Sequence, residues 1–167
     1  MYLYLVGILL FVILLVSLFA TGGNKRHALY QKRARKIWRK LSGGKLSGGQ
    51  LLVYLRRINP YVFEELVLDG FSKNGFSVRR NKRYSGDGGL DGRVIYEGKE
   101  YLIQCKRYRS YINPQHVRDF AALCDKRNHD GYFVHTGITG KRSRNEVYGS
   151  RVKIISGQKL LKLLCLV

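Results

Sequence analysis

The first charged residue of this chain is Lys25, and the apolar stretch before it most constrains how the N-terminal part can fold. Residues Tyr2–Ala20 read YLYLVGILLFVILLVSLFA and contain no Asp, Glu, Lys or Arg. A helix of this length, at about 1.5 Å per residue, reaches roughly 28 Å, close to the hydrocarbon thickness of a bilayer. A helix in a protein core rarely lacks a polar face over such a length. The stretch therefore predicts a transmembrane helix over residues 1–21.

A cleaved signal peptide is the alternative explanation of the same stretch. Such a peptide starts with positive charge, has a shorter apolar core and carries small residues before the cleavage point. Here no Lys or Arg precedes the apolar run, and Leu18 and Ala20 form a poor cleavage pair. We therefore predict that the span is retained.

The charges that follow the apolar run predict its orientation. Between Asn24 and Arg57 no residue is acidic, and the basic ones are Lys25, Arg26, Lys32, Arg33, Arg35, Lys36, Arg39, Lys40, Lys45, Arg56 and Arg57. Cytoplasmic flanks of spans carry an excess of Lys and Arg, so the N-terminus is expected outside and the rest of the chain in the cytoplasm, at a bacterial cell membrane. Three cysteines, odd in number and scattered, fit a reducing compartment.

The overall charge narrows the class of partner. The chain has 31 Lys and Arg against 11 Asp and Glu, a formal net charge of +20. Such an excess repels itself unless a polyanion neutralises it, which indicates nucleic acid, anionic lipid or both. The basic segment over 25–41 reads as a helix that could lie against anionic headgroups, at about 1 kcal/mol per cation, contact DNA phosphates, or only fix the topology.

A short duplication separates the basic helix from the remainder of the chain. Residues 41–49 read LSGGKLSGG, a composition typical of flexible spacers. We therefore divide the chain into a span (1–21), a basic juxtamembrane helix with a Gly/Ser linker (22–58) and a folded domain (59–167).

The folded domain keeps an excess of positive charge, with 20 basic and 11 acidic residues. Its patterns predict a helix from Pro60, strands over 76–80, 90–96 and 101–106, a helix over 117–126, strands over 131–135 and 152–155, and a closing helix over 158–164. A short helix is expected before the last strand. This order predicts an α/β domain with a small mixed sheet and helices on its faces.

One hairpin of this domain carries residues with catalytic chemistry. Alternation along the second strand puts Gln104 and Lys106 on one side and Ile103 and Cys105 on the core side, and the hairpin can bring Asp91 next to the first pair. Asp91, the Gln104 carbonyl and the main-chain carbonyl of Cys105 offer oxygen ligands to Mg²⁺, or to Mn²⁺ in its place. Lys106 could hold or deprotonate an attacking water and offset phosphorane charge.

Five blocks of sequence extend this interpretation. In order they read FEELVLDGFSKNGF, SGDGGLDG, YLIQCKRY, GYFVHTG and VKIISGQKLLKLL, and together they resemble the Mrr-like restriction endonuclease family of the PD-(D/E)xK nuclease superfamily. The resemblance spans Tyr61 to about Leu164. It implies a restriction-endonuclease-like sheet flanked by helices, and a metal-dependent endodeoxyribonuclease that hydrolyses phosphodiester bonds.

The resemblance also implies roles for individual residues. Asp91 matches the metal-binding aspartate and Lys106 the catalytic lysine. Gln104 takes the position that a second acid holds in many relatives. Glu64 matches the helical glutamate that supports the metal or its water, and the adjacent Glu65 is its rival for that role.

Further positions concern the surroundings of the site. Asp87 matches the acid of the family's Gly-Asp-Gly-Gly turn, in a structural role as often as a functional one. The family often has Thr-Thr-Gly where this chain has His135-Thr136-Gly137, and the segment after it is basic here. These two departures bear on the surface that contacts DNA, not on the catalytic centre.

The resulting hypothesis is a membrane-anchored, Mg²⁺-dependent DNA endonuclease similar to type IV restriction enzymes, acting from the cytoplasmic side without a small-molecule cofactor. Pairing into a homodimer is left open. The alternatives are a catalytically silent module that tethers DNA to the membrane, a nuclease similar to Holliday-junction resolvases, and a membrane-surface protein whose cations serve lipid alone.

Overall fold

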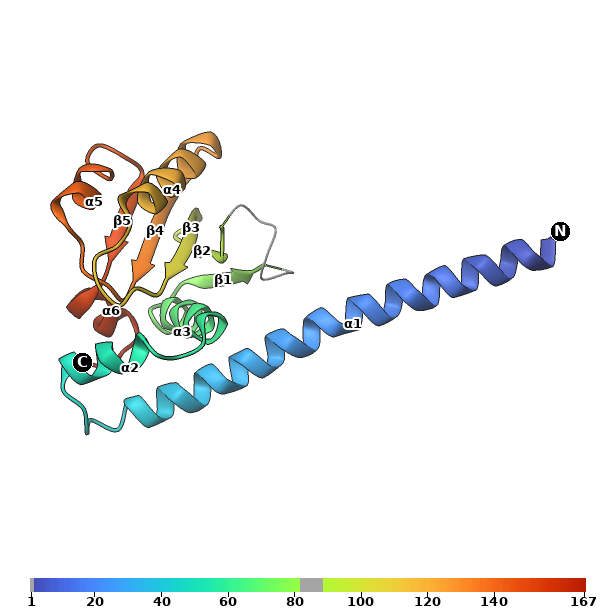
Figure 1. Cartoon of the computed structure of the whole chain (residues 1–167), viewed down its shortest axis with the longest axis horizontal. Helices are drawn as coiled ribbons and strands as arrows, with labels where there is room; N and C mark the ends of the chain where they lie inside the picture. Colours follow the sequence, from blue (N-terminus) through green and yellow to red (C-terminus); the bar gives the residue numbers. More distant parts are fainter. Residues whose placement is uncertain (1, 82–88) are drawn as a thin grey trace.

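The computed structural model describes residues 2–81 and 89–167 and folds them around a single sheet (Figure 1). Side chains are described from Arg26 onward within these ranges, and before that only at Tyr4, Val6, Ile8 and Phe11. The elements are α1 (Tyr2–Leu41), α2 (Gly48–Leu55), α3 (Pro60–Lys73), β1 (Ser77–Arg80), β2 (Gly92–Tyr96), β3 (Lys99–Lys106), α4 (Pro114–Lys126), β4 (Asp130–His135), α5 (Lys141–Asn145), β5 (Val152–Ile155) and α6 (Gly157–Leu163).

The sheet has the strand order β1-β2-β3-β4-β5. Its first three strands are antiparallel neighbours, and β4 and β5 continue it in parallel. Glu97 and Gly98 close the β2–β3 hairpin with φ angles of 50° and 77°, the left-handed pair that a tight two-residue hairpin turn requires. The predicted α/β fold with a small mixed sheet is confirmed.

Helices cover both faces of the sheet. One core cluster joins Val94, Ile103 and Cys105 of the sheet to α3 and α6, and the second joins Leu102 and Phe133 to α4. The prediction that Ile103 and Cys105 face the core is therefore correct but incomplete. The opposite face of β3 is buried as well, which makes Gln104 a buried residue rather than a surface one.

The structure differs from the prediction over residues 22–58, which it packs partly into the domain core. Ala34 and Leu41 of α1 and Leu55 of α2 are buried in the same cluster as α3. The indole N–H of Trp38 donates a hydrogen bond of 2.8 Å to the carbonyl of Leu164.

The second half of the Gly/Ser duplication is not a free spacer. Ser47 caps α2 in a capping box with Gln50: the Ser47 hydroxyl accepts from the Gln50 N–H, and the Gln50 side chain accepts from the Ser47 N–H. The Ser-x-x-Gln spacing that begins α2 therefore lies within the segment that we predicted to be flexible.

The N-terminal half of α1 extends away from the sheet and its helices (Figure 1). This 40-residue helix contains the stretch that we predicted to cross a membrane. Among the residues that the structure describes, no helix is sufficiently long and apolar to span a bilayer. That finding does not support the predicted span.

Candidate active site

Asp91 precedes β2 and lies opposite the end of β3. Its main-chain N–H donates to the carbonyl of Ile103 at 2.9 Å, and its Oδ2 accepts a 2.6 Å hydrogen bond from the main-chain N–H of Cys105. The neighbouring strand therefore fixes the orientation of the carboxylate. The N–H and C=O of one strand residue point to the same side, so the Cys105 carbonyl is directed toward Asp91 rather than toward β4.

Gln104 is buried, with 6% of its surface exposed. Its side-chain N–H donates to the carbonyl of Gly89 at 2.6 Å, and its Oε1 has no hydrogen-bond partner among the described residues. Gly89 has a φ of +83°, and a Cβ there would lie 2.6 Å from the Gln104 amide nitrogen. Glycine is therefore required, and the close approach fixes the amide with its oxygen unused. An unpaired buried oxygen costs stability unless a ligand satisfies it.

Glu64 comes from α3, whose N-terminus is capped by Asn59. The pKa of Glu64 is raised to about 8, first by burial and then by the charges of Asp91 and Glu65, against the opposing charge of Lys106. The pKa of Asp91 is raised to about 6 by burial, against the opposing effects of the Cys105 N–H and Lys106. Two crowded carboxylates beside one ammonium group form a site that a cation would stabilise.

Glu65 has a different environment from Glu64, because its carboxylate belongs to an ion-pair network. Its side chain is 1% exposed, and its carboxylate accepts from Arg80 at 2.7 Å and lies 3.4 Å from the His27 ring. Arg80 also donates to Asp69 at 2.6 Å. This ion-pair network ties α1, α3 and β1 together, which is a structural role.

Glu64 and Asp91 share a small hollow. It is lined by His27, Glu64, Glu65, Leu68, Arg80, Asn81, Leu90 and Asp91. Lys106 does not line this hollow, but its charge acts on the carboxylates of Glu64 and Asp91. Gln104 does not line it either and is hydrogen-bonded to Gly89. Asp87 lies outside the described residues.

The donor set suits a hard divalent cation that prefers oxygen. It comprises the carboxylates of Glu64 and Asp91, the unused Gln104 oxygen and the Cys105 carbonyl. Within the part of the chain that the structure describes, no three His, Cys, Asp or Glu side chains cluster as a metal site would require. Binding would therefore need the amide and main-chain oxygens in addition to the two carboxylates.

Several neighbours of the site were not identified from the sequence. His27 lies 38 residues before Glu65, and Asn81 donates from the end of β1 to the Leu90 carbonyl at 2.5 Å. Such contacts depend on how α1 and β1 pack, and no local pattern encodes them.

The His135-Thr136-Gly137 segment after β4, where this chain departs from the family, has a structural role for its histidine. Buried His135 accepts a hydrogen bond from the Gly137 N–H at 3.1 Å and pairs with Thr139 at 3.0 Å. Burial lowers the pKa of His135 to about 4, so the ring is neutral.

Comparison with known proteins decides the family. The Mrr_cat family, described as restriction endonucleases, matches residues 55–164. The chain belongs to the Mrr_cat restriction endonuclease family. This family consists of DNA phosphodiester hydrolases, so the predicted enzyme class is confirmed at that level. No curated protein matches the chain.

A solved structure supports the fold of this Mrr_cat chain. It is similar to MspJI restriction endonuclease in complex with a 27-mer oligonucleotide, with a TM-score of 0.50 and 21% sequence identity. The match covers 79% of this chain and 30% of that chain, so the Mrr_cat chain spans less than a third of the length of MspJI.

The raised pKa of Glu64 predicts how stability depends on pH without divalent cations. The value is about 8 in the folded chain against 4.5 for the ordinary group. Between these values the unfolded chain loses this proton while the folded chain keeps it, so stability falls as pH rises, by at most about 1.4 kcal/mol per pH unit. Above pH 8 the loss is complete. Thermal midpoints measured in EDTA between pH 6 and 8 should fall more steeply for the parent than for Glu64→Gln; equal slopes would contradict the assigned environment.

Proposed function

We propose that this Mrr_cat chain is a divalent-cation-dependent endodeoxyribonuclease whose site consists of Glu64, Asp91, Gln104 and Lys106. The observation that carries the proposal is the pairing of two carboxylates, Glu64 and Asp91, in one hollow with raised pKa values and the charge of Lys106 beside them. Crowded carboxylates that both resist ionisation are a mark of functional sites.

Each residue contributes a different part of the proposed chemistry. Asp91, Glu64 and the Gln104 side-chain oxygen would hold the cation, and the Cys105 carbonyl is available as a further oxygen ligand. When bound, Mg²⁺ or Mn²⁺ supplies Lewis-acid chemistry at the phosphate. Lys106 holds the attacking water or takes its proton, and its ammonium form offsets the negative charge that develops on the phosphate oxygens.

DNA is the proposed substrate, on two grounds besides the family. The segment from residue 59 onward carries 20 basic residues against 11 acidic ones. The similar MspJI structure holds an oligonucleotide according to its description. Phosphate contacts dominate the affinity of basic proteins for DNA, so binding should weaken with salt.

The test is cleavage by the full-length chain of plain, methylated and branched DNAs in Mg²⁺, with EDTA as the control. We expect cleavage that requires the cation. Cleavage confined to branched DNA would replace the restriction-like specificity with that of a junction resolvase. Binding without cleavage of any substrate in Mg²⁺ or Mn²⁺ would replace the enzyme with a silent DNA-binding module.

Anchoring at the cytoplasmic face of a membrane is a separate part of the proposal. Its support is the uncharged run over Tyr2–Ala20 followed by eleven basic residues. The described side chains in that run, at Tyr4, Val6, Ile8 and Phe11, are all exposed. A reporter fused after Val167 should be active in the cytoplasm of cells whose membrane fraction retains the chain. Recovery in the soluble fraction, or reporter activity outside the cytoplasm, would exclude this part.

A further inference from the structure

A groove with a cationic rim lies between α1, the end of α2 and the start of α3; we call it the α1–α2 groove. Its volume is about 520 Å³. The rim carries Arg33 and Lys36 of α1 and Arg57 after α2, and the floor includes Ile37, Ile58 and Val62. The rim side chains are exposed and the floor is half-buried or buried, so the groove presents positive charge above an apolar surface.

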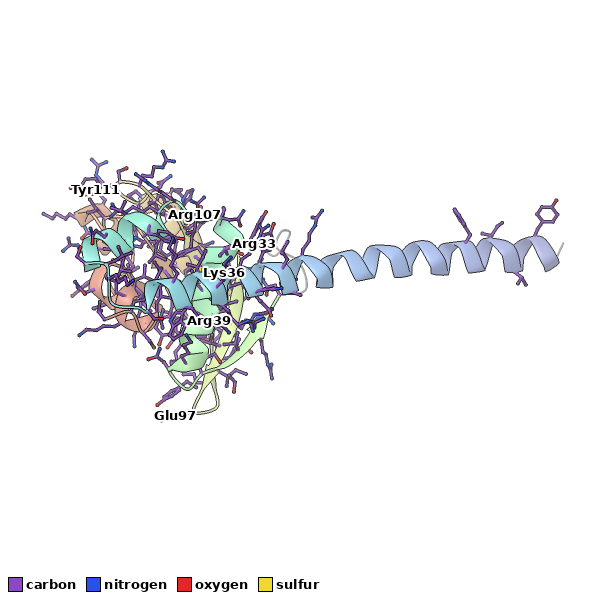
Figure 2. The ribbon with its side chains drawn as sticks, turned by 90° about the horizontal axis from the view of Figure 1, so that it is seen from below. Arg33, Lys36, Arg39, Glu97, Arg107 and Tyr111 are labelled. Atoms are coloured by element: carbon purple, nitrogen blue, oxygen red, sulfur yellow. The ribbon has the colours of Figure 1, made fainter. Side chains whose placement is uncertain are left out.

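The rim cations are held in position but not neutralised. Ala34, which follows Arg33, is fully buried, and the Trp38 indole is bonded to the Leu164 carbonyl, so this part of α1 is fixed on the domain. Figure 2, seen from the side of α1, shows Arg33, Lys36 and Arg39 following one another along that helix. Among the described residues, no Lys or Arg from 26 to 57 takes part in an ion pair.

Hydrogen bonds connect the groove to the candidate active site. The carbonyl of Arg56 accepts from Arg107 at 3.0 Å, and the Arg56 guanidinium donates to the Thr136 carbonyl at 2.9 Å. Arg107 directly follows Lys106, so the rim residue Arg57 is attached to the strand ends that carry the site.

Two helices also run from the groove to the active-site hollow. On α3, Val62 of the groove floor precedes Glu64 by two residues. On α1, Arg33 follows His27 of the hollow by six residues, about 9 Å of helix.

We propose that the α1–α2 groove binds the phosphate backbone of the DNA substrate and so extends the substrate-binding surface of the active site. The inference rests on the proposed nuclease function and deepens it. Two of its three rim cations, Arg33 and Lys36, lie before residue 55, where the family match begins. The rim charges pair with phosphates, and the apolar floor packs against the sugars of the strand.

Anionic lipid is the rival ligand for these cations, and the position of the groove along α1 argues against it. Arg33 and Lys36 follow Ala20, the end of the uncharged run, by 13 and 16 residues. These separations correspond to about 20 and 24 Å of helix. The attraction of a charged leaflet falls off within a Debye length of about 8 Å at physiological salt. If the uncharged run crosses a membrane and α1 is perpendicular to it, the groove therefore lies too far from the membrane surface to bind its headgroups.

The test compares two variants that lose the same charge. Arg33→Ala/Lys36→Ala removes two rim cations, whereas Lys126→Ala/Lys153→Ala removes two exposed cations from the end of α4 and the start of β5, at the other end of the parallel strands. Binding of the full-length chain to a labelled DNA duplex is measured in detergent and Ca²⁺ at several salt concentrations. The rim variant should lose about tenfold or more in affinity, and its salt slope should decrease by about 2. The control variant should bind like the parent.

Each outcome decides between the ligands. Equal losses in the two variants, or no loss in either, would overturn the proposal, because the cations would then act only through net charge or not at all. Intact DNA binding with lost binding to phosphatidylglycerol vesicles would overturn it in favour of lipid. Cleavage assays in Mg²⁺ test the nuclease proposal separately from the groove proposal. If the parent chain cleaves no DNA, the nuclease proposal is refuted. If the rim variant needs more protein than the parent for half-maximal cleavage, the groove proposal is supported.

Discussion

Lys106→Ala is expected to slow DNA cleavage by about 10²- to 10⁴-fold, the range typical of a lost proton-transfer group, while leaving cation binding in place. Lys106 is not among the oxygen ligands, so the donor set of the site stays complete. Its charge lowers the pKa of both Glu64 and Asp91, and its removal should therefore shift cation binding to higher pH rather than abolish it. Single-turnover cleavage and Mn²⁺ binding by calorimetry measure the two effects separately.

Asp91→Ala is expected to abolish DNA cleavage and also to weaken cation binding, because it deletes a metal ligand as well as the acceptor of the Cys105 N–H. Lys153→Ala, at an exposed lysine of β5, removes the same charge as Lys106→Ala, and this control should cleave like the parent. Gln104→Glu places a carboxylate where the wider superfamily has one, and cation binding should be kept or strengthened. Parent-like cleavage by both Asp91→Ala and Lys106→Ala in saturating Mg²⁺ would show that the site is wrongly assigned.

The sequence was sufficient for the fold of the domain because its signals there are local. Pro60 marks the first turn of α3, Glu97-Gly98 marks the hairpin turn, and alternation along β3 places Ile103 and Cys105 on a core face. The resemblance supplied Glu64 and Asp91, which the structure places in one hollow. Composition alone could not have joined residues 27 positions apart.

The remaining features depend on packing that no local pattern encodes. Leu51 and Leu55 are buried in the core cluster that also holds residues of α3 and α6, and their burial turns a Gly/Ser-rich stretch into the start of a packed helix. Glu65 and Glu64 are adjacent in sequence, so only the position of Arg80 on β1 shows which one is committed to an ion pair. The resemblance left that choice open, because the sequence alone does not show which of two consecutive helix residues points toward the site once α3 is packed on the sheet.

Arg80→Met is expected to destabilise the folded chain by about 3–5 kcal/mol, the range for breaking a buried ion pair from one side. Glu65 is 1% exposed, and the substitution removes the guanidinium that lies 2.7 Å from its buried carboxylate. Asp69 would lose its 2.6 Å contact as well. In thermal unfolding, the midpoint should fall by about 10 °C or more.

The neighbouring residue Arg79 provides the control for this prediction. It occupies the same strand, but its side chain is 67% exposed and only 3.5 Å from Glu100. Surface pairs of this kind contribute about 0–1 kcal/mol, so Arg79→Met should leave the midpoint within a few degrees of the parent. Glu65→Gln/Arg80→Met removes the buried carboxylate charge together with the guanidinium and should recover part of the loss. If Arg80→Met unfolds like Arg79→Met, the network that joins α1, α3 and β1 does not hold the active-site hollow together.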